Sequence, residues 1–330
     1  MAQVVRVGFV GAGNLANRMH YPSLAEIPEA EIVAICDLDE SRLARTADRY
    51  EVTRRYSDYR RMLQEVDLDA LYVIMPTLDP FASIVVDCLN AGKHVFMEKP
   101  PGVTVAACER MLEAAERNGR KTMVGFNRRF ATVLAEARRR IAEQGGPSAC
   151  LAEFHKNMLT SGSYWGVSIL VTDVIHAVDT LRFVCGEPVE VVSYCDRAFA
   201  DWTNVYNALI RFEGGAAGLL TANRAAGSRY ERFEIHGRGI SAYVRAPEEA
   251  EIWRDGQKEP EILRGAEMKG TEDPRLTYGY FEENRHFIDC LLQDRMPSTS
   301  LQDAVKTMRL VECIEAGGTR GHGWRATRGR

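Results

Sequence analysis

The sequence predicts an α/β protein, in which an N-terminal doubly wound parallel sheet precedes a second α/β domain with an open, mostly antiparallel sheet. Up to residue 125, short apolar runs alternate with stretches of helical periodicity, as in parallel strands joined by helices. After residue 146, most segments alternate polar and apolar side chains, which is typical of strands with one buried face. A length of 330 residues suits two domains.

The first domain is predicted over residues 1–123. Its first strand ends at a glycine-rich turn, and each later strand is followed by a helix or by a turn residue. The expected strands are Val4–Val10, Glu31–Asp37, Ala70–Met75, Lys93–Met97 and Thr122–Gly125, and the expected helices are Asn14–Ile27, Glu40–Tyr50, Tyr59–Glu65, Phe81–Ala91 and Val105–Arg117.

The second domain is predicted over residues 124–316, and residues 317–330 are expected to form a frayed, glycine- and arginine-rich tail. Helical periodicity marks Phe130–Gln144, Ile169–Cys185, Tyr278–Asp294 and Leu301–Ala316. The expected strands are Cys150–Lys156, Val189–Asp196, Asn204–Phe212, Ala217–Asn223, Arg232–Gly237, Ser241–Ala246 and Glu251–Arg254.

The composition argues against several classes of partner. A net charge of −4 gives no reason to expect nucleic acid, and the basic run Arg138–Arg140 reads as a solvated helix face. No apolar run approaches the ~18 residues of a membrane span, and the first strand begins too early for a signal peptide. The eight cysteines form no C-x-x-C pair, so we expect reduced thiols, no metal site and a cytoplasmic protein.

The turn after the first strand, Gly11-Ala12-Gly13-Asn14-Leu15-Ala16, has the spacing of a dinucleotide fingerprint. Gly11 permits the tight turn, Gly13 permits close approach of a pyrophosphate, and Ala16 permits close helix–strand packing. The phosphates would lie at the helix N-terminus, where N–H groups favour anions. The alternative is a tight turn that binds no nucleotide.

Asp37 ends the second strand roughly 20 residues after Ala16, where a carboxylate can bind the ribose hydroxyls. The same carboxylate would repel a 2′-phosphate, and the nearest following arginine is Arg42. We therefore predict NAD rather than NADP as the cofactor. Asp39 is expected to cap the next helix.

Lys99 follows the strand that ends at Met97, at the sheet edge where ligands bind in doubly wound folds. Pro100 and Pro101 stiffen the backbone beside it. Lys99 is therefore a candidate for a positive charge at the mouth of the domain, where a nicotinamide would lie. The alternative is a surface lysine paired with Glu98.

His176 lies on a helix whose polar stripe also holds Thr172, Asp173, Asp179 and Thr180. Histidine suits general-base work near neutral pH, and a neighbouring carboxylate could orient it. The alternative is a solvated helix face.

These motifs together resemble the Gfo/Idh/MocA oxidoreductases, the family of glucose–fructose oxidoreductase and inositol dehydrogenase. The resemblance covers roughly residues 3–316 and is closest to the inositol dehydrogenase branch, because His155-Lys156-Asn157 precedes His176 at a similar distance. Its most specific part is the segment from Ala91-Gly92-Lys93-His94-Val95 to Glu98-Lys99-Pro100. The other matching segments are the glycine fingerprint, Gly125-Phe126-Asn127-Arg128-Arg129-Phe130, His176-x-x-Asp179 and the helices around Phe281, Phe287 and Pro297.

The resemblance implies a Rossmann domain that binds NAD, a substrate and oligomerisation domain, a catalytic lysine at Lys99 and a catalytic histidine at His176. Pro76, Thr77, Glu98, Lys99 and Asn127 would join the fingerprint in binding the cofactor. Substrate contacts would come from Lys99, Asn127, Lys156, Asn157, Trp165, Asp173, His176 and Tyr230.

Two positions depart from the family pattern. Many members have an aspartate four residues before the histidine, whereas here Thr172 holds that position and Asp173 follows it. Both spacings return to one helix face, so either residue can partner His176. The loop after the strand at 70–75 reads Pro76-Thr77-Leu78-Asp79-Pro80-Phe81 instead of Thr-Pro-Asn-x-x-His.

The sequence therefore predicts an NAD-dependent dehydrogenase that oxidises a secondary hydroxyl of a sugar, sugar derivative or cyclitol. One alternative is a reductase of a keto-sugar or nucleotide-linked sugar, and another is a non-catalytic NAD-binding regulator. We also expect a homodimer or homotetramer, because the strands at 204–212 and 217–223 carry apolar or small residues on both faces.

Overall fold

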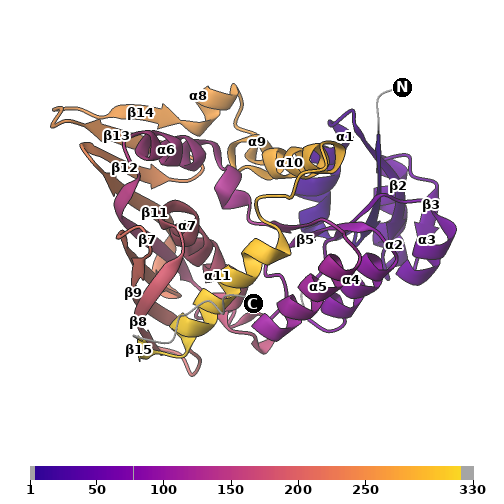
Figure 1. Ribbon diagram of the computed structural model, residues 1–330. Helices are drawn as coiled ribbons and strands as arrows, with labels where there is room; N and C mark the ends of the chain where they lie inside the picture. The colour runs from indigo at the N-terminus through magenta and orange to yellow at the C-terminus, as the bar shows by residue number, and fades with distance from the viewer. Residues whose placement is uncertain (1–3, 77, 321–330) are drawn as a thin grey trace. The chain divides into compact units, whose positions relative to one another are not determined.

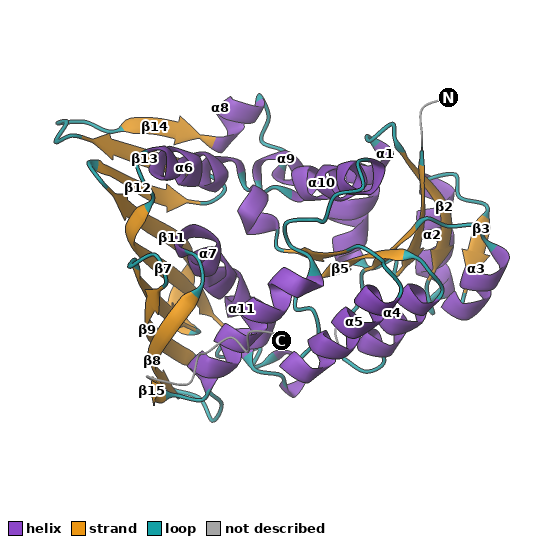
Figure 2. Ribbon diagram, viewed as in Figure 1, coloured by secondary structure: helices purple, strands orange, loops and turns teal. Residues whose placement is uncertain are grey.

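A computed structural model of the chain describes residues 4–76 and 78–320. It divides into two compact units, each with its own sheet (Figures 1 and 2). The first unit comprises Met1–Asn127 and Tyr280–Val305, and the second comprises Arg128–Gly279 and Lys306–Arg330. The chain therefore passes from the first unit to the second, back to the first, and again to the second.

The first unit is built on a six-stranded parallel sheet with the strand order β3-β2-β1-β4-β5-β6, which confirms the predicted doubly wound sheet. Every residue of β4 is buried, as expected for a central strand that helices cover on both faces. The strand order reverses between β1 and β4, and ligands bind outside the carboxyl ends of strands at such a switch point. The strands are β1 (Val5–Val10), β2 (Ala30–Cys36), β3 (Arg54–Tyr56), β4 (Ala70–Val73), β5 (His94–Glu98) and β6 (Thr122–Gly125).

Helices cover both faces of this sheet, with α1 and α10 on one side of β5 and α4 and α5 on the other (Figure 2). The first helix begins at Asn14 and contains a π-helical segment, η1. The elements are η1 (Ala16–His20), α1 (Tyr21–Ala25), α2 (Glu40–Arg49), α3 (Tyr59–Glu65), α4 (Phe81–Asn90), α5 (Val105–Arg117) and α10 (Tyr280–Leu292), and α11 (Leu301–Glu315) begins in this unit.

The position of α10 differs from the prediction, which assigned all of residues 124–316 to the second domain. This helix packs on η1 and α1, and the segment after it is tied to β6. Val124 N–H donates to the Thr299 carbonyl at 2.8 Å, and Leu301 N–H donates to Thr122 Oγ1 at 3.0 Å. The helical pattern of residues 278–294 shows that one face is buried, but it cannot show which sheet buries it.

The second unit has a nine-stranded sheet in the order β14-β13-β12-β11-β7-β10-β9-β8-β15. Only the β7–β10 pair is parallel among the strands described, which confirms the mostly antiparallel sheet. The strands are β7 (Pro147–Asn157), β8 (Pro188–Asp196), β9 (Val205–Phe212), β10 (Ala217–Asn223), β11 (Ala225–Gly237), β12 (Ile240–Arg245), β13 (Glu249–Arg254), β14 (Glu261–Arg264) and β15 (Gly318–Arg320).

The helices α6 (Thr132–Glu143) and α7 (Ile175–Cys185) both pack on the same face of this sheet (Figure 1). The other face is exposed, and β9 alternates buried and exposed residues along its length. Leu209 and Leu219 are 52% and 46% exposed on that open face. The helices are α6 (Thr132–Glu143), α7 (Ile175–Cys185) after the π-helical turn η4 (Leu170–Val174), α8 (Gly265–Lys269) and α9 (Pro274–Thr277), with short 3₁₀ turns at η2 (Asn127–Phe130) and η3 (Tyr164–Gly166).

The predicted tail is partly structured, because Gly318–Arg320 pair antiparallel with β8. A three-residue strand at a sheet edge has too little periodicity to be visible in the sequence. For the same reason β14, α8 and α9 were not predicted. No helix in residues 4–76 and 78–320 combines the length and the apolar character that a membrane span requires.

Candidate nucleotide and substrate sites

The glycine turn lies at the carboxyl end of β1, and its geometry requires glycine at one position. Gly11 has φ of 111°, and a Cβ there would lie 2.1 Å from the Ile74 carbonyl oxygen. Gly13 instead faces open space, with nothing within 4 Å of a Cβ built on it. Asn14 and Leu15 are exposed at the start of the helix, whereas Ala16 is buried. The turn therefore presents an accessible helix start, as a pyrophosphate site requires.

Asp37 follows β2 at the same sheet edge and is held against the glycine turn. Its Oδ2 accepts the Ala12 N–H at 2.7 Å, and its Oδ1 accepts the Asp39 N–H at 2.8 Å. Arg42 also reaches Oδ1, at 3.1 Å from Nη2. Asp39 caps α2 as predicted, because its side chain accepts the Arg42 N–H. Asp37 therefore stabilises the glycine turn, in addition to its predicted role as a ligand of the ribose.

Tyr21 supports the turn from behind. Its hydroxyl donates to the Gly11 carbonyl at 3.2 Å, and its ring stacks on Phe9 at 3.9 Å between centroids. Burial raises the pKa of Tyr21 well above its usual value, and the nearby Asp37 adds to this. The phenol therefore stays protonated, and its hydrogen bond holds the Gly11 carbonyl in place.

Three further predicted cofactor residues, Pro76, Thr77 and Lys99, follow β4 and β5 in the sequence. Pro76 is exposed in the loop after β4, and Thr77 lies outside the described residues. Lys99 is half-buried directly after β5. Because β2, β1, β4 and β5 are parallel neighbours in the sheet, the residues that follow them lie along one edge of it.

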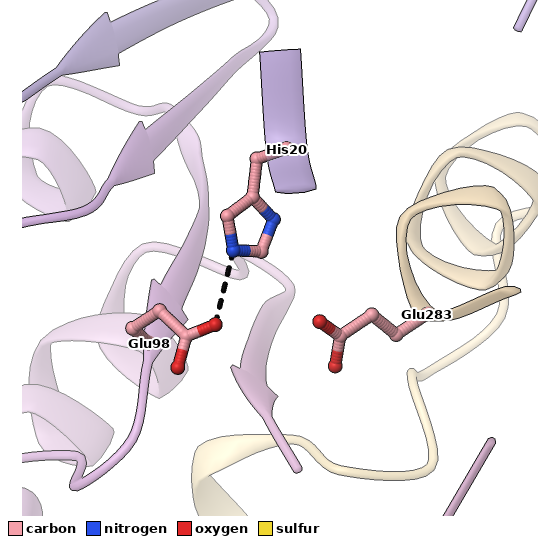
Figure 3. Close-up of side chains that lie close together, drawn as sticks. All are labelled: His20, Glu98 and Glu283. Carbon is pink, nitrogen blue, oxygen red and sulfur yellow. Dashed lines mark hydrogen bonds and ion pairs between the residues drawn. The ribbon is translucent and has the colours of Figure 1, made fainter. Parts of the chain in front are cut away.

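Glu98 lies beside His20 (Figure 3), and it also binds the backbone of Lys99. Its Oε1 lies 3.0 Å from His20 Nε2, and its Oε2 accepts the Lys99 N–H at 3.1 Å. A Cβ at position 125 would lie 2.8 Å from Oε1, so Gly125 makes room for this carboxylate. Glu283 from α10 points toward the same place. The buried carboxylate therefore fixes where the chain turns into Lys99.

His20, Glu98 and Glu283 are all buried, and one ligand atom from each lies within 4.8 Å of the others, so they could hold a cation. The hydrogen bond between His20 and Glu98 already pairs two of these groups. The other ring nitrogen of His20 contacts the Asn284 side chain, whose amide nitrogen lies 3.2 Å from Nδ1. We interpret the hydrogen-bonded chain from Asn284 through His20 to Glu98 as a support for the backbone of Lys99.

In the second unit, the polar stripe that carries His176 is buried rather than solvated. Thr172, His176, Asp179 and Thr180 are 6%, 5%, 1% and 0% exposed. The turn before His176 is π-helical, and such turns occur frequently at functional sites. The solvated-face alternative is therefore wrong for this helix.

The two candidate partners of His176 have different surroundings. Thr172 Oγ1 donates to the Ser168 carbonyl at 3.2 Å. Asp173 Oδ2 lies 3.2 Å from Arg224 Nη2 and 3.8 Å from Lys156 Nζ. Asp173 thus belongs to an ion-paired group, whereas the Thr172 hydroxyl proton is directed to the backbone.

Two family models match the chain over these same regions. The first, described as an oxidoreductase family with an NAD-binding Rossmann fold, matches residues 5–126, and the second, described as the GFO/IDH/MocA C-terminal domain, matches residues 135–242. The chain belongs to the Gfo/Idh/MocA oxidoreductase family. NAD is accordingly its cofactor, as Asp37 predicted.

Relatives within the family align along most of the chain. A myo-inositol 2-dehydrogenase from Thermotoga maritima is 27% identical over 331 residues, which cover 93% of this chain and 94% of its own. A D-apiose dehydrogenase from Paraburkholderia graminis is 27% identical over 323 residues, or 92% and 84% of the two chains. A dehydrogenase structure from Chromobacterium violaceum shares the fold, with a TM-score of 0.87 at 21% identity over 95% of both chains.

The remaining predicted substrate residues of this Gfo/Idh/MocA chain are only partly brought together. Lys156 lies beside Asp173, and its Nζ is 3.1 Å from the Tyr164 hydroxyl. Asn157 is exposed at the end of β7, and Trp165 belongs to η3. Asn127 is buried (1% exposed). The contacts of these four residues with a substrate therefore stay predictions.

Tyr230 is placed differently from the expectation. It pairs with His155, whose side chain lies on the opposite sheet face from the buried Phe154. Tyr230 therefore lines a groove of about 750 Å³ on the open face, together with Arg232, Tyr243, Arg245, Glu249, Glu251 and Trp253. Neighbouring residues of β11 point to opposite faces, so proximity in sequence to a predicted site did not place Tyr230 in it.

Sequence reasoning missed three contributors to these sites. His20 contacts Glu98, Glu283 lies beside them, and Arg224 faces Asp173. Each lies far along the chain from the residue it supports, so no local motif signals it. The two π-helical turns were also missed, because a helical pattern does not reveal a single wider turn.

Proposed function

We propose that this Gfo/Idh/MocA protein is an NAD-dependent dehydrogenase that oxidises a secondary hydroxyl of a sugar, sugar derivative or cyclitol. The observation that carries the proposal is the burial of His176 with ion-paired Asp173 in the preceding turn. A buried base with a positioned carboxylate nearby suits proton removal from an alcohol. The two relatives named above act on inositol and apiose, which are both polyhydroxylated.

The first unit would bind the cofactor, and NAD would serve as the hydride acceptor. The turn Gly11–Ala16 would hold the pyrophosphate, and Asp37 would accept hydrogen bonds from the ribose hydroxyls. Pro76, Thr77 and Asn127 are proposed to complete the site.

The second unit is assigned to the substrate. His176 would take the hydroxyl proton as hydride leaves the same carbon. Lys99 is proposed to donate a hydrogen bond to that oxygen and to stabilise the developing alkoxide charge. Asp173 would accept a hydroxyl hydrogen bond or orient the imidazole, and Lys156 and Asn157 are proposed to bind further hydroxyl groups.

The open face of the nine-stranded sheet is proposed as the contact between subunits of a homodimer, or of a dimer of dimers. It exposes Leu209 and Leu219, which are directly paired neighbours in β9 and β10. Exposed apolar groups beside charged ones are typical of surfaces that bind another protein.

A turnover screen with NAD and a panel of polyols and cyclitols tests the function. We expect NADH formation with at least one cyclitol or sugar, and loss of that activity in His176→Ala. The kcat/KM for oxidation should rise with pH across the range in which free imidazole titrates, about 6.5. That rise should be absent in His176→Ala.

The outcomes separate the alternatives. Turnover only with a keto-sugar or nucleotide-linked sugar and NADH would favour the reductase. NAD binding without turnover on any member of the panel, in either direction, would favour the regulator.

A further inference from the structure

Arg224 is a fully buried arginine at the junction of β10 and β11, and no sequence motif singles it out. It is 1% exposed, and its backbone is fixed from two sides. Its N–H donates to the Asn204 carbonyl at 2.8 Å, and its carbonyl accepts the Met158 N–H at 2.8 Å. The side chain is therefore delivered to a defined place.

The guanidinium group lies in apolar surroundings with one close carboxylate. Its central carbon is 5.0 Å from the ring centroid of Phe154, and Nη2 is 3.2 Å from Asp173 Oδ2. Burial lowers the pKa of Arg224, and Asp173 is the strongest of the groups that oppose this. Glu231 also acts on it, but Glu231 accepts a hydrogen bond from Arg128 at 2.9 Å. Asp173 is therefore the main counter-charge.

This buried charge is poorly satisfied by protein groups. Beyond the ion pair between Nη2 and Asp173 Oδ2, neither Nε nor Nη2 of Arg224 has a hydrogen bond of good geometry with any of the residues that the structure describes. A buried guanidinium with unused donors is costly for folding. The position of this costly charge beside Asp173 indicates a role in the site.

Arg224 and Lys156 approach the same oxygen of Asp173. Lys156 Nζ is 3.8 Å from Oδ2, and the side chains of Asp173 and Lys156 are 20% and 32% exposed, against 1% for Arg224. A ligand can therefore reach Asp173 and Lys156, but it cannot reach Arg224 directly. Asp173 is the nearest charged partner of Arg224 and is itself accessible, so it is the most direct link between Arg224 and a substrate.

We propose that Arg224 is a positioning residue, which holds Asp173 by Oδ2 so that Oδ1 is presented to a substrate hydroxyl beside His176. This inference rests on the proposed function, because it assigns Asp173 to the substrate. Arg224 thereby fixes the orientation of the carboxylate in the π-helical turn η4.

Steady-state kinetics of Arg224→Gln and Arg224→Lys test the positioning role. In Arg224→Gln, kcat/KM for the polyol should fall about 10- to 100-fold, as for a small misplacement of a reactive group, while the KM for NAD stays nearly constant. Arg224→Lys keeps the charge and should recover part of the loss. The control is Arg182→Gln, because Arg182 is similarly buried and pairs with Glu187 at 2.8 Å. It should lower thermal stability and leave both kinetic constants near those of the wild type.

A double-mutant cycle on unfolding stability supplies a readout that does not need turnover. If Arg224 holds Asp173, the double variant Arg224→Gln/Asp173→Asn should lose less stability than the sum of the single variants. Additive losses would overturn the contact. Wild-type kinetics in Arg224→Gln would overturn the positioning role. If the wild type oxidises no polyol, the proposed function fails while the cycle still decides whether Arg224 holds Asp173.

Discussion

Cofactor choice should change with one substitution, Asp37→Ala. The cation that a 2′-phosphate needs is already present, because Arg42 Nη2 lies 3.1 Å from Asp37 Oδ1 and its side chain is 45% exposed. Removing the carboxylate deletes one negative charge from the predicted ribose site and takes away one of the two carboxylates that pair with Arg42. We therefore expect NADP to gain on NAD without any added arginine.

The size of the shift is estimated from Coulomb's law, with an assumed separation of about 4 Å between Arg42 and a 2′-phosphate. Two unit charges 4 Å apart interact by about 4 kcal/mol at an effective dielectric constant of ~20. Because Arg42 is half-exposed, solvent screening reduces this to about 2 kcal/mol, or roughly 30-fold in the NADP-to-NAD ratio of Kd values. Asp37→Ala also leaves the buried Ala12 N–H without its acceptor, at a cost of about 1–3 kcal/mol. That cost weakens both cofactors together, so the ratio is the diagnostic quantity.

The measurement is a calorimetric titration of NAD and NADP against wild type, Asp37→Ala and Asp39→Ala at low ionic strength. Asp39 is the matched control, since it also pairs with Arg42, at 3.6 Å, but its side chain caps α2 and does not bind the glycine turn. Asp39→Ala should move the ratio less than Asp37→Ala. Tighter binding of NADP by the wild type, or an unchanged ratio in Asp37→Ala, would refute the role given to Asp37.

Three further substitutions test other parts of the molecule. Lys99→Ala should lower kcat by about 10²- to 10³-fold, because it removes a donor to the developing oxyanion, while the Kd for NAD changes little; equal losses would indicate cofactor positioning instead. Burial, together with Arg120 and Lys121, lowers the pKa of His94 to about 4. The neutral imidazole therefore stabilises the fold above about pH 6.5, and about 3 kcal/mol is lost as the pH falls to 4. Urea unfolding at both pH values should show a smaller loss for His94→Asn, and an identical loss would contradict this. Leu209→Glu should shift light scattering toward the monomer, and a monomeric wild type at micromolar concentration would exclude the proposed interface.

Local motifs predicted the first unit well because its chemistry is local. The turn Gly11–Ala16 and Asp37 lie within two consecutive strands and the helix between them, so spacing alone brings them to one edge. The helices at Tyr59–Glu65 and Val105–Arg117 have the predicted bounds, since cap residues or turn residues stand at their ends. A sequence is informative where the contact partners are near one another in the chain.

The predictions that differ from the structure concern contacts between segments that are distant in the sequence. Glu283 lies in a helix whose amphipathic pattern is equally compatible with either sheet, and only packing on η1 assigns it to the first unit. Tyr230 depends on the register between β11 and β7, which includes an irregularity just before it. A shift of one residue moves a side chain to the other face, and nothing in the pattern of residues 225–230 fixes that register.

The polar stripe on α7 illustrates how burial separates two kinds of role. Asp179 accepts two hydrogen bonds from Arg129, at 2.7 and 2.6 Å, and one from Thr307 at 2.8 Å. All of these partners are buried, so this end of the stripe ties α7 to neighbouring segments of the second unit. At the other end, Asp173 remains 20% exposed between two cations. The same pattern of polar residues at helical spacing therefore serves structure at Asp179 and is open to a ligand at Asp173, and only the long-range partners of each carboxylate distinguish them.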